Sequence, residues 1–259
     1  ETDSIHITKK NISKIKVVVN GAGASAMACS DLFLKLGVKK NNLTMIDSKG
    51  VISFDRKGLN KWKLKYAKKT KDTTLGDALK NADVFLGLSS AGILKKEMIK
   101  HMAKNPIIFA CANPDPEILP EEAYRIRKDA IIATGRSDYA NQVNNLIGFP
   151  YIFRGALDVR AKTINEEMKI SAANAIAKLA RERVPDEVAA AMGGDRPKYG
   201  KDYIIPSTFD PRLISVIPVA VAKAAIKSGV ARKKIENFNF YSEQSVSYTH
   251  LRAHETVTY

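Results

Sequence analysis

A glycine-rich segment near the start of the sequence could bind phosphate through its backbone. It follows the β-branched run at residues 15–19 and precedes an apolar helix pattern. In such a strand–loop–helix, the first glycine permits a tight turn and the second lets the backbone approach a pyrophosphate, which the helix amides then stabilise. Gly21 and Gly23 take these positions, and Ala26 replaces a third glycine that only needs to be small. The segment predicts a dinucleotide cofactor bound by Gly21, Gly23, Ala24, Ser25 and Ala26.

The residues after the next apolar run could contact the adenosine end of that dinucleotide. Asp47 ends the run, where a carboxylate binds the ribose hydroxyls of NAD and repels the 2′-phosphate of NADP. Ser48, Lys49, Arg56 and Lys57 follow and could neutralise the same phosphate. These residues favour different cofactors. We therefore predict contacts from Asp47, Ser48 and Lys49, and both NAD and NADP stay open.

Polar loops follow three of the later apolar runs. Ser89 lies in a small, flexible loop, Asn113 precedes two prolines, and Asn144 and Asn145 come after the last run. Ligands of an open α/β sheet bind outside the carboxyl ends of its strands, and uncharged amides can hold a carboxylate or keto oxygen. We therefore predict Ser89 and Asn113 as further contacts of the dinucleotide cofactor. Asn and Ser also form ordinary turns and caps, so a purely structural role stays open for each loop.

The sequence gives no support to several other chemistries. His6 and His101 have no neighbouring metal-type ligands, and HExxH, CxxC and a Ser-His-Asp order are absent. Two cysteines cannot form a disulfide framework. We find no apolar stretch of about 20 residues and no signal peptide. These features predict a cytoplasmic protein that does not enter a membrane.

The positive charge is concentrated in the first part of the chain. The formal net charge is +15, and residues 1–71 hold 16 Lys or Arg against 5 Asp or Glu. Residues 56–71 contain eight of these bases and no acid. Such a cluster suits a phosphorylated ligand, nucleic acid or an anionic membrane surface, or it forms a solvated helix face. Trp62 and Tyr66 stand four residues apart, so we expect them on one helical face in the core. That placement argues against a base-stacking platform for nucleic acid.

Strand and helix patterns alternate over the first 160 residues. Continuous apolar strands between helices are typical of a parallel sheet covered on both faces. The fold class predicted is α/β, a Rossmann-like doubly wound parallel sheet with added C-terminal helices. The strands are predicted at residues 15–19, 43–46, 83–88, 106–110 and 130–133. The helices are predicted at residues 27–36, 74–80, 95–104, 121–128, 164–183 and 211–228.

Six segments resemble, in order and spacing, the cofactor-binding half of bacterial malic enzymes. They are VVVNGAGASAMAC, MIDSKGVI, DVFLGLSSAG, ANPDPEI, ATGRSDYANQVNN and GFPYIFRGALDVRA. The resemblance covers roughly residues 5–240. The later segment DYIIPSTFDPRLISVIPVAVAKAAIKSGVA resembles the form of the enzyme that carries a C-terminal phosphate acetyltransferase-like domain.

The resemblance implies an activity and a set of ligands. Malic enzymes oxidise L-malate with NAD(P)+, decarboxylate the oxaloacetate and form pyruvate, using Mg2+ or Mn2+. By motif, Asn113 and Asn145 match asparagines that contact malate near the nicotinamide, and Asn144 is a weaker candidate. An amide can orient the 2-hydroxyl and the C1 carboxylate of malate for hydride transfer.

The resemblance also implies that catalytic parts lie elsewhere. In the family, the tyrosine acid, the lysine base and most metal carboxylates belong to a preceding segment. We therefore expect no catalytic residue and no metal ligand in this chain, a missing N-terminal malic domain, and no turnover by the chain alone. The family also implies a homo-oligomer. The alternatives are another dehydrogenase, of the amino-acid or methylene-tetrahydrofolate type, or a basic nucleic-acid-binding module.

The predicted domain organisation follows from these patterns. Residues 1–245 are assigned to the NAD(P)-binding domain, with a core at about 14–160 and a helical extension at about 161–240. Residues 246–259 continue no family pattern and resemble translated sequencing-adaptor read-through, so we interpret them as a non-native tail.

Overall fold

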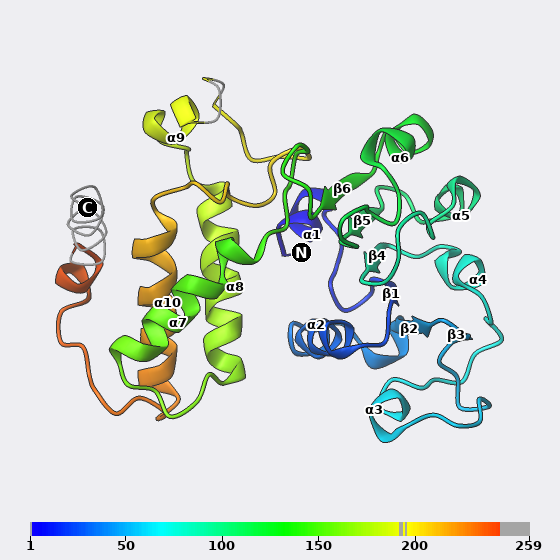
Figure 1. Cartoon of the computed structure of the whole chain (residues 1–259), viewed down its shortest axis with the longest axis horizontal. Helices are drawn as coiled ribbons and strands as arrows, with labels where there is room; N and C mark the ends of the chain where they lie inside the picture. The colour runs from blue at the N-terminus through cyan, green and yellow to red at the C-terminus, as the bar shows by residue number, and fades with distance from the viewer. Residues whose placement is uncertain (1, 192–193, 195, 244–259) are drawn as a thin grey trace, which may run out of the picture. The chain divides into compact units, whose positions relative to one another are not determined.

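The chain forms two compact units. The computed structural model describes residues 2–191, 194 and 196–243 (Figure 1), and the predicted tail at 246–259 lies outside them. The boundary between the two units lies between Val143 and Asn144. The core of the cofactor-binding domain was predicted to extend further, to about residue 160. The reason is that residues 149–158 form a helix packed on a later helix. The assignment of residues 1–245 to one cofactor-binding domain stays a prediction.

The first unit is built on a six-stranded sheet with the strand order β3-β2-β1-β4-β5-β6. All neighbouring strands are parallel except β2 and β3, which are antiparallel. The predicted Rossmann-like doubly wound fold is therefore confirmed. The strands are β1 (Val17–Asn20), β2 (Leu43–Asp47), β3 (Gly50–Val51), β4 (Val84–Gly87), β5 (Ile107–Ala110) and β6 (Ile131–Thr134).

The strands could be recognised in the sequence as apolar runs because their residues are buried. Every residue of β1, β4, β5 and β6 is buried, as expected for parallel strands covered on both faces. The five predicted strands are confirmed, each within two residues of its predicted bounds. The short strand β3 was not predicted, because two residues carry no periodicity and its pairing depends on the turn at Gly50.

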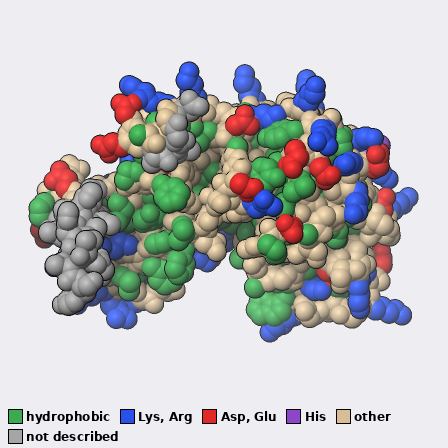
Figure 2. Space-filling view, turned by 45° about the horizontal axis from the view of Figure 1, so that its top comes forward, with side chains coloured by type: hydrophobic (Ala, Val, Ile, Leu, Met, Phe, Trp, Pro, Cys, Tyr) green, Lys and Arg blue, Asp and Glu red, His purple; other side chains and the backbone are tan. Residues whose placement is uncertain are grey.

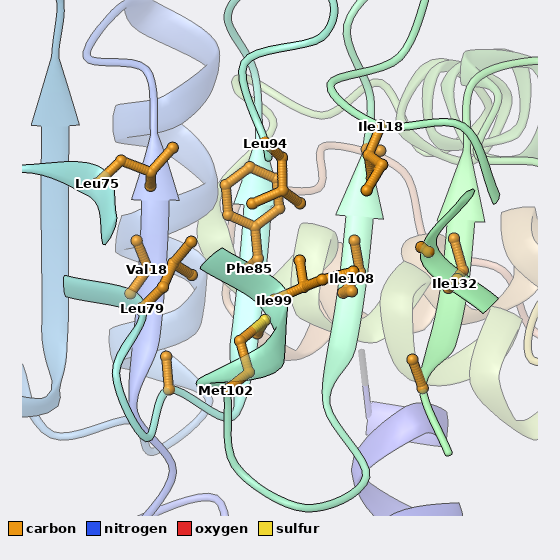
Figure 3. Packing of buried hydrophobic residues seen from close by; sticks show 14 of the residues in the cluster. Val18, Leu75, Leu79, Phe85, Leu94, Ile99, Met102, Ile108, Ile118 and Ile132 are labelled. Atoms are coloured by element: carbon orange, nitrogen blue, oxygen red, sulfur yellow. The ribbon is translucent and has the colours of Figure 1, made fainter. Parts of the chain in front are cut away.

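Helices cover both faces of this sheet. Leu79 of α4 and Ile99 of α5 pack on Val18, Phe85 and Ile108, which project from the strands into one layer (Figure 3). Both views draw α2 on the opposite face (Figure 1, Figure 3). The helices are α1 (Thr2–Thr8), α2 (Ala24–Lys35), the 3-10 turn η1 (Lys40–Asn42), α3 (Lys61–Leu64), α4 (Leu75–Leu79), α5 (Lys96–Lys100) and α6 (Pro120–Ile126).

Four helices were predicted in this part, at 27–36, 74–80, 95–104 and 121–128, and all four are present. The third is shorter than predicted and ends at Lys100. The chain turns there, and the amide of Ala103 donates to the carbonyl of Ala82, 2.9 Å away, instead of continuing the helix. The helices α1 and α3 were not predicted.

The second unit is helical. Its core joins α7, α8 and α10, and the two long helices predicted at 164–183 and 211–228 are confirmed as α8 and α10. A Cβ atom at Gly155 of α7 would lie 2.6 Å from the carbonyl oxygen of Pro218, so glycine allows α7 and α10 to approach closely. The helices are η2 (Asn145–Ile147), α7 (Phe149–Asp158), α8 (Glu166–Arg181), α9 (Asp186–Ala191) and α10 (Leu213–Lys227). Across the described residues, none of the helices has the length and apolarity to cross a bilayer.

Candidate functional site

The strand order reverses between β1 and β4, and the loops after these two strands define the candidate site. Ligands of open α/β sheets bind at such a switch point, outside the carboxyl ends of the strands. Backbone hydrogen bonds fix both loops: the Gly21 amide donates to Ile46 at 2.9 Å, and the Leu88 amide donates to Asn20 at 2.9 Å. The two loops therefore leave the sheet in defined directions.

The two glycines of the first loop have different reasons to be glycine. Gly21 has a φ of +130°, and a Cβ atom there would lie 2.7 Å from the carbonyl oxygen of Leu88. Gly23 caps the amino end of α2 with extended backbone, and a Cβ atom there would meet nothing within 4 Å. The turn itself requires glycine at position 21, whereas position 23 leaves open space beside the helix amides.

A pocket of about 320 Å³ lies at this edge of the sheet. Of the predicted cofactor contacts, Gly21, Asp47, Ser48 and Ser89 line it. The lining does not include the predicted Gly23, Ala24, Ser25, Ala26, Lys49 and Asn113. Six further residues line the pocket and were not among the individually predicted contacts: Asn20, Ala22, Lys63, Leu88, Ser90 and Ile93.

Asp47 is held by cations. Its Oδ1 accepts from the Arg56 guanidinium at 2.8 Å, and its Oδ2 accepts from the Lys63 ammonium at 2.7 Å. Partial burial works to raise the pKa of Asp47, but the hydrogen bonds from Arg56, Lys63 and the Lys49 amide hold that pKa well below its usual range. The side chain is 8% exposed. Asp47 is therefore an anion whose charge is already compensated by two cations.

The basic run at residues 56–71 does not form one continuous helix face, although Lys57, Lys61, Lys65, Lys69 and Lys71 are exposed. Its single helical turn, α3, ends at Leu64, and several of its cations have fixed partners: Lys65 pairs with Asp31 at 2.5 Å, and Lys68 donates to the Asn41 carbonyl at 2.8 Å. On the face drawn in Figure 2, Lys and Arg side chains are scattered and do not gather in one patch.

The prediction that both aromatic residues of this run lie in the core is correct for Tyr66 and wrong for Trp62. Tyr66 is buried as expected, but Trp62 is 61% exposed. The prediction assumed one continuous helix, in which residues four apart share a face. The helix ends between them, so the shared face does not exist.

The loops after β4 and β5 are joined by a residue that sequence reasoning missed, Glu117. Its carboxyl group is fully buried and accepts from the backbone amides of Ser89 at 3.1 Å and Ala112 at 3.0 Å. The Ser89 hydroxyl also accepts from the Asn20 amide group at 2.6 Å. The sequence does contain a hint of this residue: Glu117 stands between a proline and an apolar residue, directly after a strand-end loop.

The three predicted malate contacts fall in different units. Asn113 is exposed in the first unit, directly after Ala112. Asn144 and Asn145 begin the second unit and line a pocket of about 540 Å³ there. The side-chain oxygen of Asn144 accepts from the Leu146 amide at 2.9 Å, so this residue caps η2.

Within the described residues, no three His, Cys, Asp or Glu side chains gather closely enough to hold a metal ion. The site described here consists of backbone amides, hydroxyls, side-chain amides and one charge-compensated carboxylate. Such groups bind and orient a ligand that carries phosphate and sugar hydroxyls.

The chain is similar in sequence to known malic enzymes. The chain is 57% identical over 243 residues to an NADP-dependent malic enzyme of Rhizobium meliloti, and the match covers 93% of this chain. It is 50% identical over 243 residues to an NAD-dependent malic enzyme of the same organism. The match covers 32% of the length of either relative, so this chain spans about a third of them.

A solved structure agrees with these relatives. The malic enzyme of Entamoeba histolytica superposes on 98% of this chain with a TM-score of 0.84 and 34% identity, and the match covers 52% of that chain. The family model described as malic enzyme, NAD binding domain, matches residues 2–190. Because that match includes well over half of the residues and the fold agrees, the chain belongs to the malic enzyme NAD-binding domain family.

Proposed function

We propose that this chain is the part of a malic enzyme that binds NAD(P)+, in an enzyme that converts L-malate to pyruvate and CO2. The observation that carries the proposal is the pocket at the switch point between β1 and β4, with a glycine loop on one side and Ser89 on the other. In this reading the pyrophosphate lies on the loop at Gly21 and Gly23 and on the first amides of α2, which are those of Ala24, Ser25 and Ala26. Family membership supports the same ligand.

We further propose that NADP is preferred over NAD. Asp47 alone would repel a 2′-phosphate. Arg56 and Lys63 both pair with it, so the three side chains together carry a net positive charge. Ser48 and Lys49 are exposed in the turn between β2 and β3, directly beside this cluster. Their hydroxyl and ammonium groups suit a phosphate better than a neutral ribose edge.

Malate binding is assigned to Asn113 and Asn145, with Asn144 in a supporting position because its side chain already caps η2. Amide groups would orient the hydroxyl and carboxylate of malate toward the nicotinamide without changing charge during turnover. The tyrosine acid, the lysine base and the ligands of Mg2+ or Mn2+ are assigned to the remaining part of the enzyme. The metal, when bound, polarises the oxygen at C2 of the substrate. The whole enzyme is proposed to be a cytoplasmic homo-oligomer.

Titration with dinucleotides tests the proposed function directly. The 259-residue chain is titrated with NADP+ and with NAD+ by calorimetry, and its thermal unfolding is followed with each. At a hundredfold excess over Kd, binding should raise the midpoint by roughly 5 °C. NADP+ should give the lower Kd. If neither dinucleotide binds at millimolar concentration, the proposal is wrong.

A further inference from the structure

We propose that Glu117 is a positioning residue for the dinucleotide site, fixing the loops that carry Ser89 and Asn113. The inference rests on the proposed function, because it assumes a dinucleotide in the pocket beside Ser89. Glu117 itself does not line that pocket. It would act through the backbone of the residues it holds.

The carboxyl group of Glu117 lies between the carboxyl ends of β4 and β5. One oxygen accepts from the Ser89 amide at 3.1 Å and the other from the Ala112 amide at 3.0 Å. Ser89 lines the pocket, and Ala112 directly precedes Asn113. One fully buried side chain thus connects the two strand-end loops to which cofactor contacts are assigned.

Backbone hydrogen bonds nearby secure other parts of the loops. The Gly92 amide donates to the Pro116 carbonyl at 3.1 Å, and the Leu94 amide donates to the Glu117 carbonyl at 3.0 Å. These bonds do not involve the Glu117 side chain, so we expect them to remain when that side chain is replaced. A change at the side chain should therefore release the segments at Ser89 and Ala112 while the rest of the connection stays in place.

Gly87 provides the space for this carboxyl group. A Cβ atom at Gly87 would lie 2.3 Å from Cδ of Glu117 and 2.4 Å from its Oε1. The backbone at Gly87 is not left-handed, so its conformation does not require glycine. The small residue at the end of β4 is explained by the buried carboxyl group beside it.

Glu117→Gln separates positioning from packing because it keeps the volume of the side chain. Both oxygens of Glu117 accept hydrogen bonds, whereas glutamine presents one oxygen and one NH2 donor. The NH2 group must face one of the two backbone amides, and that amide loses its acceptor. One of the two loops is then no longer held.

The experiment measures the Kd for NADP+ by calorimetry, well below the unfolding midpoint of each variant. Glu117→Gln should raise Kd about tenfold, the loss expected when one hydrogen bond to a charged acceptor no longer holds the loop. Asp129→Asn is the matched control. Its carboxylate also accepts a hydrogen bond from a backbone amide, that of Asn105 at 2.7 Å, and in addition from the Arg127 guanidinium. It precedes β6 at the amino end of that strand, whereas Glu117 lies at the carboxyl ends of β4 and β5. This control should lower the unfolding midpoint and leave Kd unchanged.

Gly87→Ala covers the case in which Glu117→Gln does not fold, because it leaves Glu117 itself in place. Gly87→Ala should displace the carboxyl group and raise Kd about as much as Glu117→Gln, again roughly tenfold. In a Glu117→Ala background, the same Gly87→Ala change should have little further effect, because the space it fills is empty. Equal effects of Gly87→Ala in both backgrounds would contradict the role of the carboxyl group.

The outcomes separate this inference from the proposed function. If the unaltered chain binds no dinucleotide, the proposed function fails and the inference with it. If the unaltered chain binds NADP+ and Glu117→Gln binds it equally well, only the inference fails. It also fails if Asp129→Asn weakens binding as much as Glu117→Gln, since general destabilisation would then explain both.

Discussion

At the end of β2, a carboxylate that resembles the ribose-binding acid of NAD enzymes is surrounded by positive charge. Arg56 contacts both oxygens of Asp47, and it also donates to the Gly50 carbonyl at 3.0 Å. The guanidinium thus fastens the turn between β2 and β3 while compensating the acid. The same residue has a structural and an electrostatic effect on the end of the pocket to which we assign the adenosine.

Lys49 allows a test of the cofactor preference at this site. Lys49→Met should raise the Kd for NADP+ about fivefold, because an exposed ammonium near a phosphate contributes modestly, and it should leave the Kd for NAD+ unchanged. Calorimetric titration of both cofactors measures the effect. Lys71→Met removes an exposed charge from the basic run at residues 56–71, has no assigned contact with the cofactor, and is the control. A parallel loss of NAD+ affinity in Lys49→Met would contradict the assignment.

Asp47 should make stability depend on pH in a defined direction. Its pKa is lower in the folded chain than in the unfolded chain, so its contribution is complete above the unfolded pKa of about 3.9 and is lost as the pH falls through the folded value. Asp47→Asn should cost about 2 kcal/mol at pH 7, since it leaves two cations without their partner. Urea unfolding measures this cost. The difference between the two proteins should stay constant from pH 7 to 5 and shrink below about pH 4.

At the scale of elements, the loop between β1 and α2 contains two glycines that should respond differently to substitution. Gly21→Ala should destabilise the fold by about 1–3 kcal/mol, because its φ is positive and its Cβ atom would collide with Leu88. Gly23→Ala has open space and should leave stability within about 0.5 kcal/mol. It should nonetheless weaken NADP+ binding, because the methyl group stands where the pyrophosphate is assigned. Urea unfolding and calorimetry separate the two effects.

The buried strands had strong local signals and were predicted, whereas several short elements and the ten-residue helix α7 were not. The strands β1, β4, β5 and β6 are wholly buried, so each reads as an apolar run. By contrast, β3 exists through its pairing with β2, and α3 is a single turn. Such short elements have too few residues for a periodicity to be visible in the sequence.

At the scale of the whole molecule, we expect the chain to bind cofactor without turning over malate. The described residues bring no metal-ligand group together, and the chain spans about a third of the length of the two Rhizobium meliloti relatives. With saturating L-malate, NADP+ and Mn2+, the purified chain should form no NADPH above background, as followed by absorbance. A full-length relative in the same assay is the positive control. Sustained, malate-dependent NADPH formation by the chain would overturn the assignment of acid and base to another part of the enzyme.

The sequence by itself determined the parallel sheet, the glycine loop and the family resemblance. Each depends on local order along the chain: apolar runs, a glycine spacing and motifs in succession. The tertiary structure determined which polar groups far apart in the sequence form hydrogen bonds with each other. Lys63 lies 16 residues beyond Asp47 and Glu117 lies 28 beyond Ser89, yet each pair is in hydrogen-bonding contact. These pairings arise only when the chain folds, because burial and the parallel alignment of strand ends bring distant residues together.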